Sequence, residues 1–166
     1  MKQFKAPWGK FLIISSIIAC SLVIVAPLVP VYFSEKIRSM TLLVYLLYSM
    51  PILFIGIASL YVVRGYTLKP DVLEIQRLLW STKIPLGDLK SARVEPNAMN
   101  GSIRTFGNGG LLSFTGRYWS KALGGYKSYV TNMQNTVVME FANRKIVLSP
   151  DNPEAFVAAL PIPAKK

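Results

Sequence analysis

The stretch RTFGNGGLLSFTGRYWSKALGGYKSYVTN, residues 104–132, is the most distinctive part of this chain. It contains six glycines, six aromatic residues and four basic residues, and it contains no acidic residue. Such a composition suits a phosphate-binding loop, a nucleic-acid surface, a membrane-facing surface or an irregular β-sheet. The sequence on either side of the stretch distinguishes these four interpretations.

The N-terminal part of the chain contains two long runs without charge. Residues 11–33 and 41–63 include no charged side chain, and each run is 23 residues long. A helix of that length spans roughly 34 Å, enough to cross a hydrocarbon core of about 30 Å. Neither run has the polar face that a helix of a soluble protein would need. We therefore predict two transmembrane helices, which the short turn 34–40 joins into an antiparallel hairpin.

Prolines and one cysteine refine this prediction. Pro27 and Pro30 are expected to end or bend the first helix, and Pro51 to kink the second. Residues 17–20, ending at Cys20, loosely resemble a lipoprotein cleavage box. However, the residues that follow stay apolar and the run exceeds the usual length of a signal peptide core, so a small residue packed within the membrane is the favoured interpretation of Cys20.

Basic residues outside the two runs predict the orientation. Three lysines precede the first run and three basic residues follow the second: Lys2, Lys5, Lys10, Arg64, Lys69 and Arg77. The connecting turn carries fewer. The positive-inside rule therefore predicts that both termini lie in the cytoplasm.

The remaining residues, 64–166, carry 14 basic and seven acidic side chains, a formal charge of +7. Short apolar or alternating runs bounded by turn residues predict a β-rich domain. The expected strands are 65–68, 72–79, 84–86, 89–95, 136–142 and 145–148, with turns at 70–71, 80–83 and 143–144. Asn152 followed by Pro153 predicts the start of a short C-terminal helix.

Four segments carry a family resemblance: YTLKPDVLEIQR, IPLGDLKSARV, the 104–132 stretch and VVMEFANRKIVLSPDNPEAFVAAL. They resemble bacterial pleckstrin-homology-like domains, in particular the membrane-anchored group with two helices before the domain. The resemblance implies a membrane-anchored α+β protein, in which a partly open barrel of two packed antiparallel sheets is closed by the C-terminal helix. Together with the uncharged runs and the positive-inside rule, this predicts a protein of the bacterial inner membrane. Its N-terminal tail and two-helix hairpin occupy residues 1–64, and its cytoplasmic domain occupies residues 65–166. The resemblance implies no site residue, because fold does not fix function.

The glycines are expected to serve backbone geometry. A phosphate-binding loop needs glycines that open onto a helix and a Lys-Ser/Thr pair, whereas strand-like residues follow here. Glycine allows positive φ at turns and bulges, so these residues would bend strands around a small barrel that Phe106 and Phe114 help to fill. The structural glycines are Gly107, Gly109, Gly110 and Gly116. Gly124–Gly125 would form a hairpin turn.

The basic and aromatic residues of the same stretch form the candidate binding site. Cations interleaved with Tyr and Trp suit an anionic lipid surface, and they also suit nucleic acid. The membrane tether favours lipid, and no nucleic-acid partner is expected. A solvated cationic face is the alternative without function. The candidate residues are Arg104, Arg117, Tyr118, Trp119, Lys121, Tyr126, Lys127 and Tyr129.

The residues offer little to catalysis. The chain has no histidine and its one cysteine lies in the first uncharged run, which removes the commonest general base, most zinc sites and a thiol nucleophile. We expect no enzyme, no metal and no cofactor, with an Asp/Lys/Ser enzyme as the remaining alternative. The expected function is a membrane-tethered binding module that recognises a protein partner or self-associates. The alternatives are docking on anionic lipid and an accessory role to an envelope enzyme or transporter.

Overall fold

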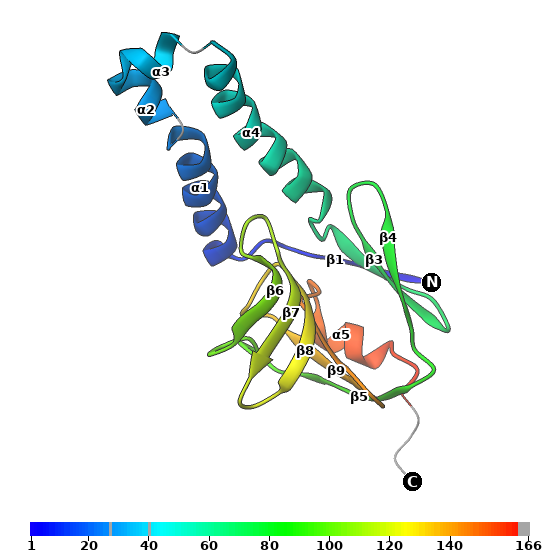
Figure 1. The fold of residues 1–166 in the computed structure, drawn as a ribbon. Coiled ribbons are helices and arrows are strands. Elements are labelled where there is room, and N and C mark those ends of the chain that lie inside the picture. The colour runs from blue at the N-terminus through cyan, green and yellow to red at the C-terminus, as the bar shows by residue number, and fades with distance from the viewer. Residues whose placement is uncertain (27, 40, 163–166) are drawn as a thin grey trace.

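The structure is a computed structural model that describes residues 1–26, 28–39 and 41–162 (Figure 1). Helices α1 and α4 lie side by side and extend away from a β-rich domain, and α2 and α3 lie at their far ends. The four helices are α1 (Lys10–Val25), α2 (Leu28–Phe33), α3 (Glu35–Ser39) and α4 (Thr41–Leu60).

The first uncharged run forms two helices, in agreement with the prediction that its prolines end or bend the first helix. Helix α1 has 16 residues and ends at Val25, and a separate helix α2 begins at Leu28. The residue two positions beyond α1 is Pro27, and a proline lacks the amide hydrogen and has the ring that together stop a helix. Pro27 itself lies outside the described residues. Pro30 lies within the separate helix α2.

The second run forms a continuous helix. Helix α4 has 20 residues and passes through Pro51 without interruption. Its segment Leu42–Leu60 has a mean hydropathy of 2.1 and is long and apolar enough to cross a membrane. Helix α1 is apolar as well but shorter. Within the described residues, length and composition therefore give one candidate span and a second, shorter apolar helix.

A four-stranded sheet joins the base of the helix pair. Its strands follow the order β1-β2-β3-β4 and are β1 (Lys2–Lys5), β2 (Gly65–Leu68), β3 (Val72–Gln76) and β4 (Ser81–Pro85). No strand is predicted from the sequence before the first helix, but residues 2–5 form β1, in which Phe4 lies opposite Tyr66 of β2. Because β1 precedes α1 and β2 follows α4, neighbouring strands hold both bases of the helix pair.

The second sheet has six strands in the order β5-β9-β10-β8-β7-β6. They are β5 (Leu89–Val94), β6 (Ile103–Gly109), β7 (Phe114–Ser120), β8 (Gly124–Val130), β9 (Val137–Phe141) and β10 (Lys145–Leu148). The pairing is antiparallel except between β8 and β10, which are parallel, so the expectation of wholly antiparallel sheets is wrong at this pair. The turn expected at 80–83 lies three residues earlier, where Arg77 N–H donates to Trp80 O at 2.9 Å.

Two apolar clusters stabilise the domain. The larger cluster lies between the sheets and includes Tyr66, whose hydroxyl donates to Tyr129 O at 2.6 Å and accepts from Ser149 N–H at 3.1 Å. Burial raises the pKa of Tyr66 to about 12. The second cluster lies beneath β7 and β8 and takes in Leu12 from α1. Helix α1 therefore packs on the domain as well as extending from it.

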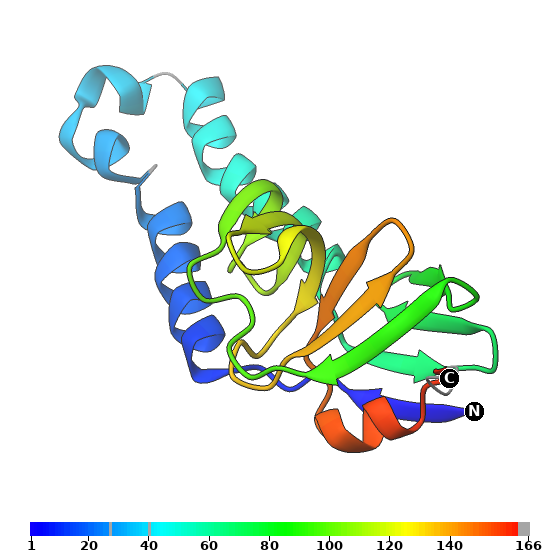
Figure 2. The ribbon, with the colours of Figure 1, turned by 90° about the horizontal axis from the view of Figure 1, so that it is seen from below.

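Helix α5 (Pro153–Ala158) closes the sandwich as the sequence predicts. The side chain of Asn152 accepts from Ala155 N–H at 3.0 Å, and Pro153 occupies the first turn. Figure 2 shows α5 beside β1. There the ring of Phe156 meets the ring of Phe4 edge-on, with 5.1 Å between the centroids.

The predicted structural glycines divide into two kinds. Gly107, Gly110 and Gly116 have positive φ, and the first and last lie opposite each other on β6 and β7. Gly109 does not have positive φ, and a Cβ atom there would lie 2.6 Å from Nη1 of Arg104. Phe114 is buried as expected. Phe106 is 75% exposed, so the prediction that it fills the barrel is wrong.

Candidate functional site

An open cleft of about 870 Å³ lies where the helix pair meets the outer face of β6, β7 and β8. One side of the cleft is mostly apolar and comes from the helices. Residues three or four positions apart share one face of a helix, and both helices follow this spacing. The helix residues that line the cleft are Ser15, Ala19, Val23, Phe54, Ile57, Ala58 and Tyr61.

The other side of the cleft is cationic and comes from the sheet. Side chains alternate between the two faces of a strand, so Arg117 of β7 and Lys127 of β8 lie on the outer face, directly opposite each other in the register. Tyr129 lies two pairs further along, opposite Thr115, and therefore on the same face. Like charges directly opposite each other destabilise a sheet. A bound anion would relieve that repulsion.

Two further arginines complete the cationic wall. Arg104 of β6 occupies the space that a side chain at position 109 would take. Arg77 follows β3, and its Nη1 donates to Tyr61 O at 2.6 Å at the base of α4. Its guanidinium carbon lies 5.6 Å from the ring centroids of Tyr61 and Tyr129. Burial lowers the pKa of Arg77, but an arginine stays protonated at neutral pH.

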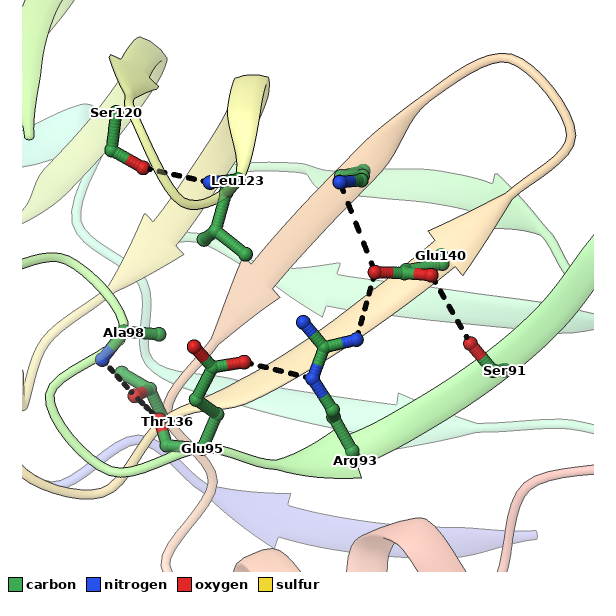
Figure 3. A network of polar contacts seen from close by, with 9 residues as sticks. Ser91, Arg93, Glu95, Ala98, Ser120, Leu123, Thr136 and Glu140 are labelled. Carbon is green, nitrogen blue, oxygen red and sulfur yellow. Dashed lines mark hydrogen bonds and ion pairs between the residues drawn. The ribbon is translucent and has the colours of Figure 1, made fainter.

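The cleft cations have no carboxylate partner within the part of the chain that the structure describes. The acids of the six-stranded sheet are engaged elsewhere (Figure 3). Arg93 of β5 donates from Nη1 to Glu140 of β9 at 2.7 Å. It also donates from Nε to Glu95, just after β5, at 2.8 Å. The hydrogen bond from Arg93 lowers the pKa of Glu140. Among the described residues, no carboxylate is therefore paired with a cation of the cleft.

The β6–β7 turn fixes the shape of the cleft. Figure 1 shows this turn reaching the base of α1. The hydroxyl of Ser15 donates to Gly110 O at 3.0 Å, and the hydroxyl of Ser16 accepts from Leu112 N–H at 2.9 Å. The ring of Phe114 stacks on Phe11. These contacts hold the cationic strands at a set position relative to α1.

The structure divides the eight candidate residues into three groups. Those that line the cleft are Arg104, Arg117, Lys127 and Tyr129. Tyr118 and Tyr126 alternate with the outward residues and stack on each other in the second core at 5.9 Å, so they are not on the surface where the sequence analysis placed them. Trp119 and Lys121 lie near the turn between β7 and β8. This turn is at the other end of β7 from the β6–β7 turn that contacts α1.

The sequence analysis missed two parts of this region. Arg77 lies 27 residues before Arg104, and no local pattern connects them. The tip between β3 and β4 exposes apolar side chains beside the base of α4: Leu78 is 47% exposed, Leu79 is 74% exposed and Trp80 is 40% exposed. Trp80 meets Tyr61 edge-on, with ring centroids 5.3 Å apart. The sequence signal that could have identified this exposed apolar tip is the run Leu78-Leu79-Trp80 at a predicted turn.

The arrangement can bind an anion but shows no catalytic constellation. Arginine and lysine beside aromatic rings recognise phosphate or carboxylate groups through charge and hydrogen bonds. In the described ranges, no three His, Cys, Asp or Glu residues gather in a way that could hold a metal ion.

The fold and the cleft define a class of protein: N-terminal apolar helices joined to a β-sandwich with a short C-terminal helix. A family model described as "Bacterial PH domain" matches residues 64–162, and the chain belongs to this family, which is typically non-catalytic. Comparison with curated proteins and with solved structures gave no match.

Proposed function

We propose that this protein is a membrane-anchored binding module that recognises anionic lipid headgroups at the cytoplasmic face of the bacterial inner membrane. In this proposal α1 and α4 form a two-helix anchor, both termini lie in the cytoplasm, and the protein catalyses no reaction. The observation that carries the proposal is the cleft, in which four cations without carboxylate partners adjoin the base of the helix pair: Arg77, Arg104, Arg117 and Lys127.

Charge and position together support lipid as the ligand. Each cation close to an anionic leaflet contributes about 1 kcal/mol, so four contribute at most about 4 kcal/mol. The tether already keeps the domain at the surface, where the effective concentration is high. Tyr61 and Trp80 lie where α4 ends, and rings of this kind prefer the depth of the headgroups. The cleft would therefore open at headgroup depth.

Recognition of a protein partner, or self-association, is a second candidate. Strand β6 forms one edge of the six-stranded sheet, and its Ile103 is 65% exposed opposite the half-exposed Trp119. An apolar edge strand offers backbone groups and side chains to a further strand. A partner there would cover Ile103 and Trp119 and would leave the cleft free, so variants of the cleft cations separate the two functions.

Topology gives the first test. A cytoplasm-active reporter fused after Lys166 should be active, and a periplasm-active reporter placed between Ser34 and Ser39 should be active as well. The reason is the bias of basic residues toward the chain segments outside the helix pair. The opposite pattern of activities would contradict the cytoplasmic location of the domain and with it the proposal.

The cleft cations give the second test. In nanodiscs of full-length protein, energy transfer from tryptophan to dansyl-labelled phosphatidylglycerol should exceed transfer to dansyl-labelled phosphatidylcholine. Replacing both Arg117 and Lys127 by Gln should remove about 2 kcal/mol, roughly 30-fold in relative affinity, and erase most of this preference.

The matched control is Lys121→Gln, which removes a cation of the same hairpin at the end away from the helices. It should leave the preference nearly unchanged. Raising salt to about 0.5 M should weaken the preference of the unaltered protein, because screening then acts within a few ångströms. Equal transfer to both lipids, or equal loss in the control, would refute headgroup recognition by the cleft.

A further inference from the structure

We infer that the cleft binds one whole anionic phospholipid, with its headgroup against the cations and one acyl chain in the groove between α1 and α4. This inference rests on the proposed function, because the same cations would hold the headgroup. It goes further in stating that the lipid is a bound ligand with a defined site and is not merely one of many lipids under a charged surface.

The two sides of the cleft match the two ends of such a lipid. The cationic wall lies on the sheet, and the groove residues Ala19, Val23, Phe54, Ile57 and Ala58 are all apolar. A soluble anion would contact only the cationic side. A neutral lipid would leave the cations unpaired. An anionic amphiphile with a chain satisfies both sides.

The dimensions agree with one chain. From Ser15 to Val23 the helix rises about 12 Å, and from Phe54 to Tyr61 about 10 Å. One leaflet contributes about 15 Å of hydrocarbon, so the groove covers much of the depth that one chain occupies. The cleft volume of about 870 Å³ lies in the range of roughly 300–1,000 Å³ of pockets that enclose one small ligand.

The contacts around the groove make it a formed site. Small side chains at Ala19 and Ala58 leave the space open, while Ser15 and Ser16 hold the β6–β7 turn at its side. Arg77 is fixed by its bond to Tyr61 O at 2.6 Å, at the point where the groove meets the sheet. A cation held in advance in this way contacts a headgroup without a further loss of side-chain entropy.

The test measures lipid retained by the full-length protein after purification in mild detergent. Phospholipid extracted per protein chain should approach one and should be anionic, and native mass spectrometry should show a single adduct. Ala19→Trp and Ala58→Trp fill the groove, and each should lower retention by roughly tenfold, equivalent to about 1.4 kcal/mol.

Matched controls place the same residue on the outer faces of the same helices. Ile18→Trp and Leu53→Trp replace side chains that are 54% and 57% exposed and do not line the cleft, so they should retain lipid normally. Ala58→Leu fills the groove with less bulk and should give an intermediate loss. If a tryptophan variant fails to fold, Ala58→Leu and the amount of lipid retained by the unaltered protein still test the inference.

Two results would overturn the inference. One is retention of no lipid, or of neutral lipid as readily as anionic lipid, by the unaltered protein. The other is displacement of the bound lipid by millimolar glycerol 3-phosphate, which carries the headgroup phosphate without a chain. Headgroup recognition by the charged surface is tested separately, by the energy-transfer preference for phosphatidylglycerol. Loss of retention in the groove variants with that preference intact would support the bound lipid.

Discussion

Replacing Gly116 by valine is expected to destabilise the bacterial PH domain by about 3–5 kcal/mol, a large part of the roughly 5–15 kcal/mol that stabilises a typical domain. Gly116 has φ of 142°, a conformation that side chains with a branched Cβ disfavour. A Cβ atom at this position would lie 2.1 Å from Phe106 O and 2.8 Å from Gly107 Cα. Both contacts are with backbone atoms, so no rotation of a side chain relieves them.

The partner position makes the requirement stronger. Gly107 lies opposite Gly116, has φ of 110°, and would place a Cβ atom 2.4 Å from Thr115 O. The backbones of β6 and β7 therefore approach each other at a point where neither can carry a side chain. Valine at 116 would separate the two strands and carry the Arg104 and Arg117 side chains apart.

Thermal unfolding of the full-length protein in detergent, followed by near-ultraviolet circular dichroism, measures this effect. The control is Gly125→Val in the adjacent strand β8, where φ is not positive and a Cβ atom would meet nothing within 4 Å. It should change stability by less than about 0.5 kcal/mol. Equal melting temperatures for the two variants would show that the Gly107–Gly116 pair has no special backbone role.

The sequence predicted the class of fold because its signals are local. Strands β2, β5, β9 and β10, and helix α5 with its Asn152 cap, follow from runs of a few residues and from turn chemistry. Strand β1 could not be predicted in this way. It has four residues, two of them lysines, and its partner β2 lies about 60 positions further along the chain.

The candidate site was predicted in part for a related reason. A block rich in cations and aromatic rings was visible, but strand alternation sends Arg117 and Lys127 to one face and Tyr118 and Tyr126 to the other. That separation depends on the strand register, which the bulge between Arg104 and Phe106 also shifts. Arg77, which lines the cleft, begins the β3–β4 turn, whereas the sequence predicts this turn three residues later.

Replacing Phe156 by alanine is expected to cost about 3–5 kcal/mol, the usual loss for a phenylalanine removed from a core. Phe156 is fully buried, and its ring meets Phe4 and Tyr66 edge-on, with centroids 5.1 Å and 6.2 Å away. Chemical denaturation of the full-length protein measures the loss. Phe106→Ala removes the same atoms from a side chain that is 75% exposed, and it should be close to neutral.

The same change should loosen strand β1, which leads into helix α1, because the ring of Phe156 contacts Phe4 of that strand. Apart from its pairing with β2, β1 is held by two hydrogen bonds between Lys5 and Asp151 and by the ring of Phe4 on Phe156. The carbonyl of Lys5 accepts from Asp151 N–H at 3.0 Å, and Lys5 N–H donates to Asp151 Oδ1 at 3.2 Å. In Phe156→Ala, amide hydrogen exchange of residues 2–6 should therefore rise more than that of β9 or β10. Unchanged exchange in β1 would mean that its backbone bonds alone fix it. A selective rise would show that α5, whose residues lie about 150 positions after β1, stabilises the strand that leads into the first helix.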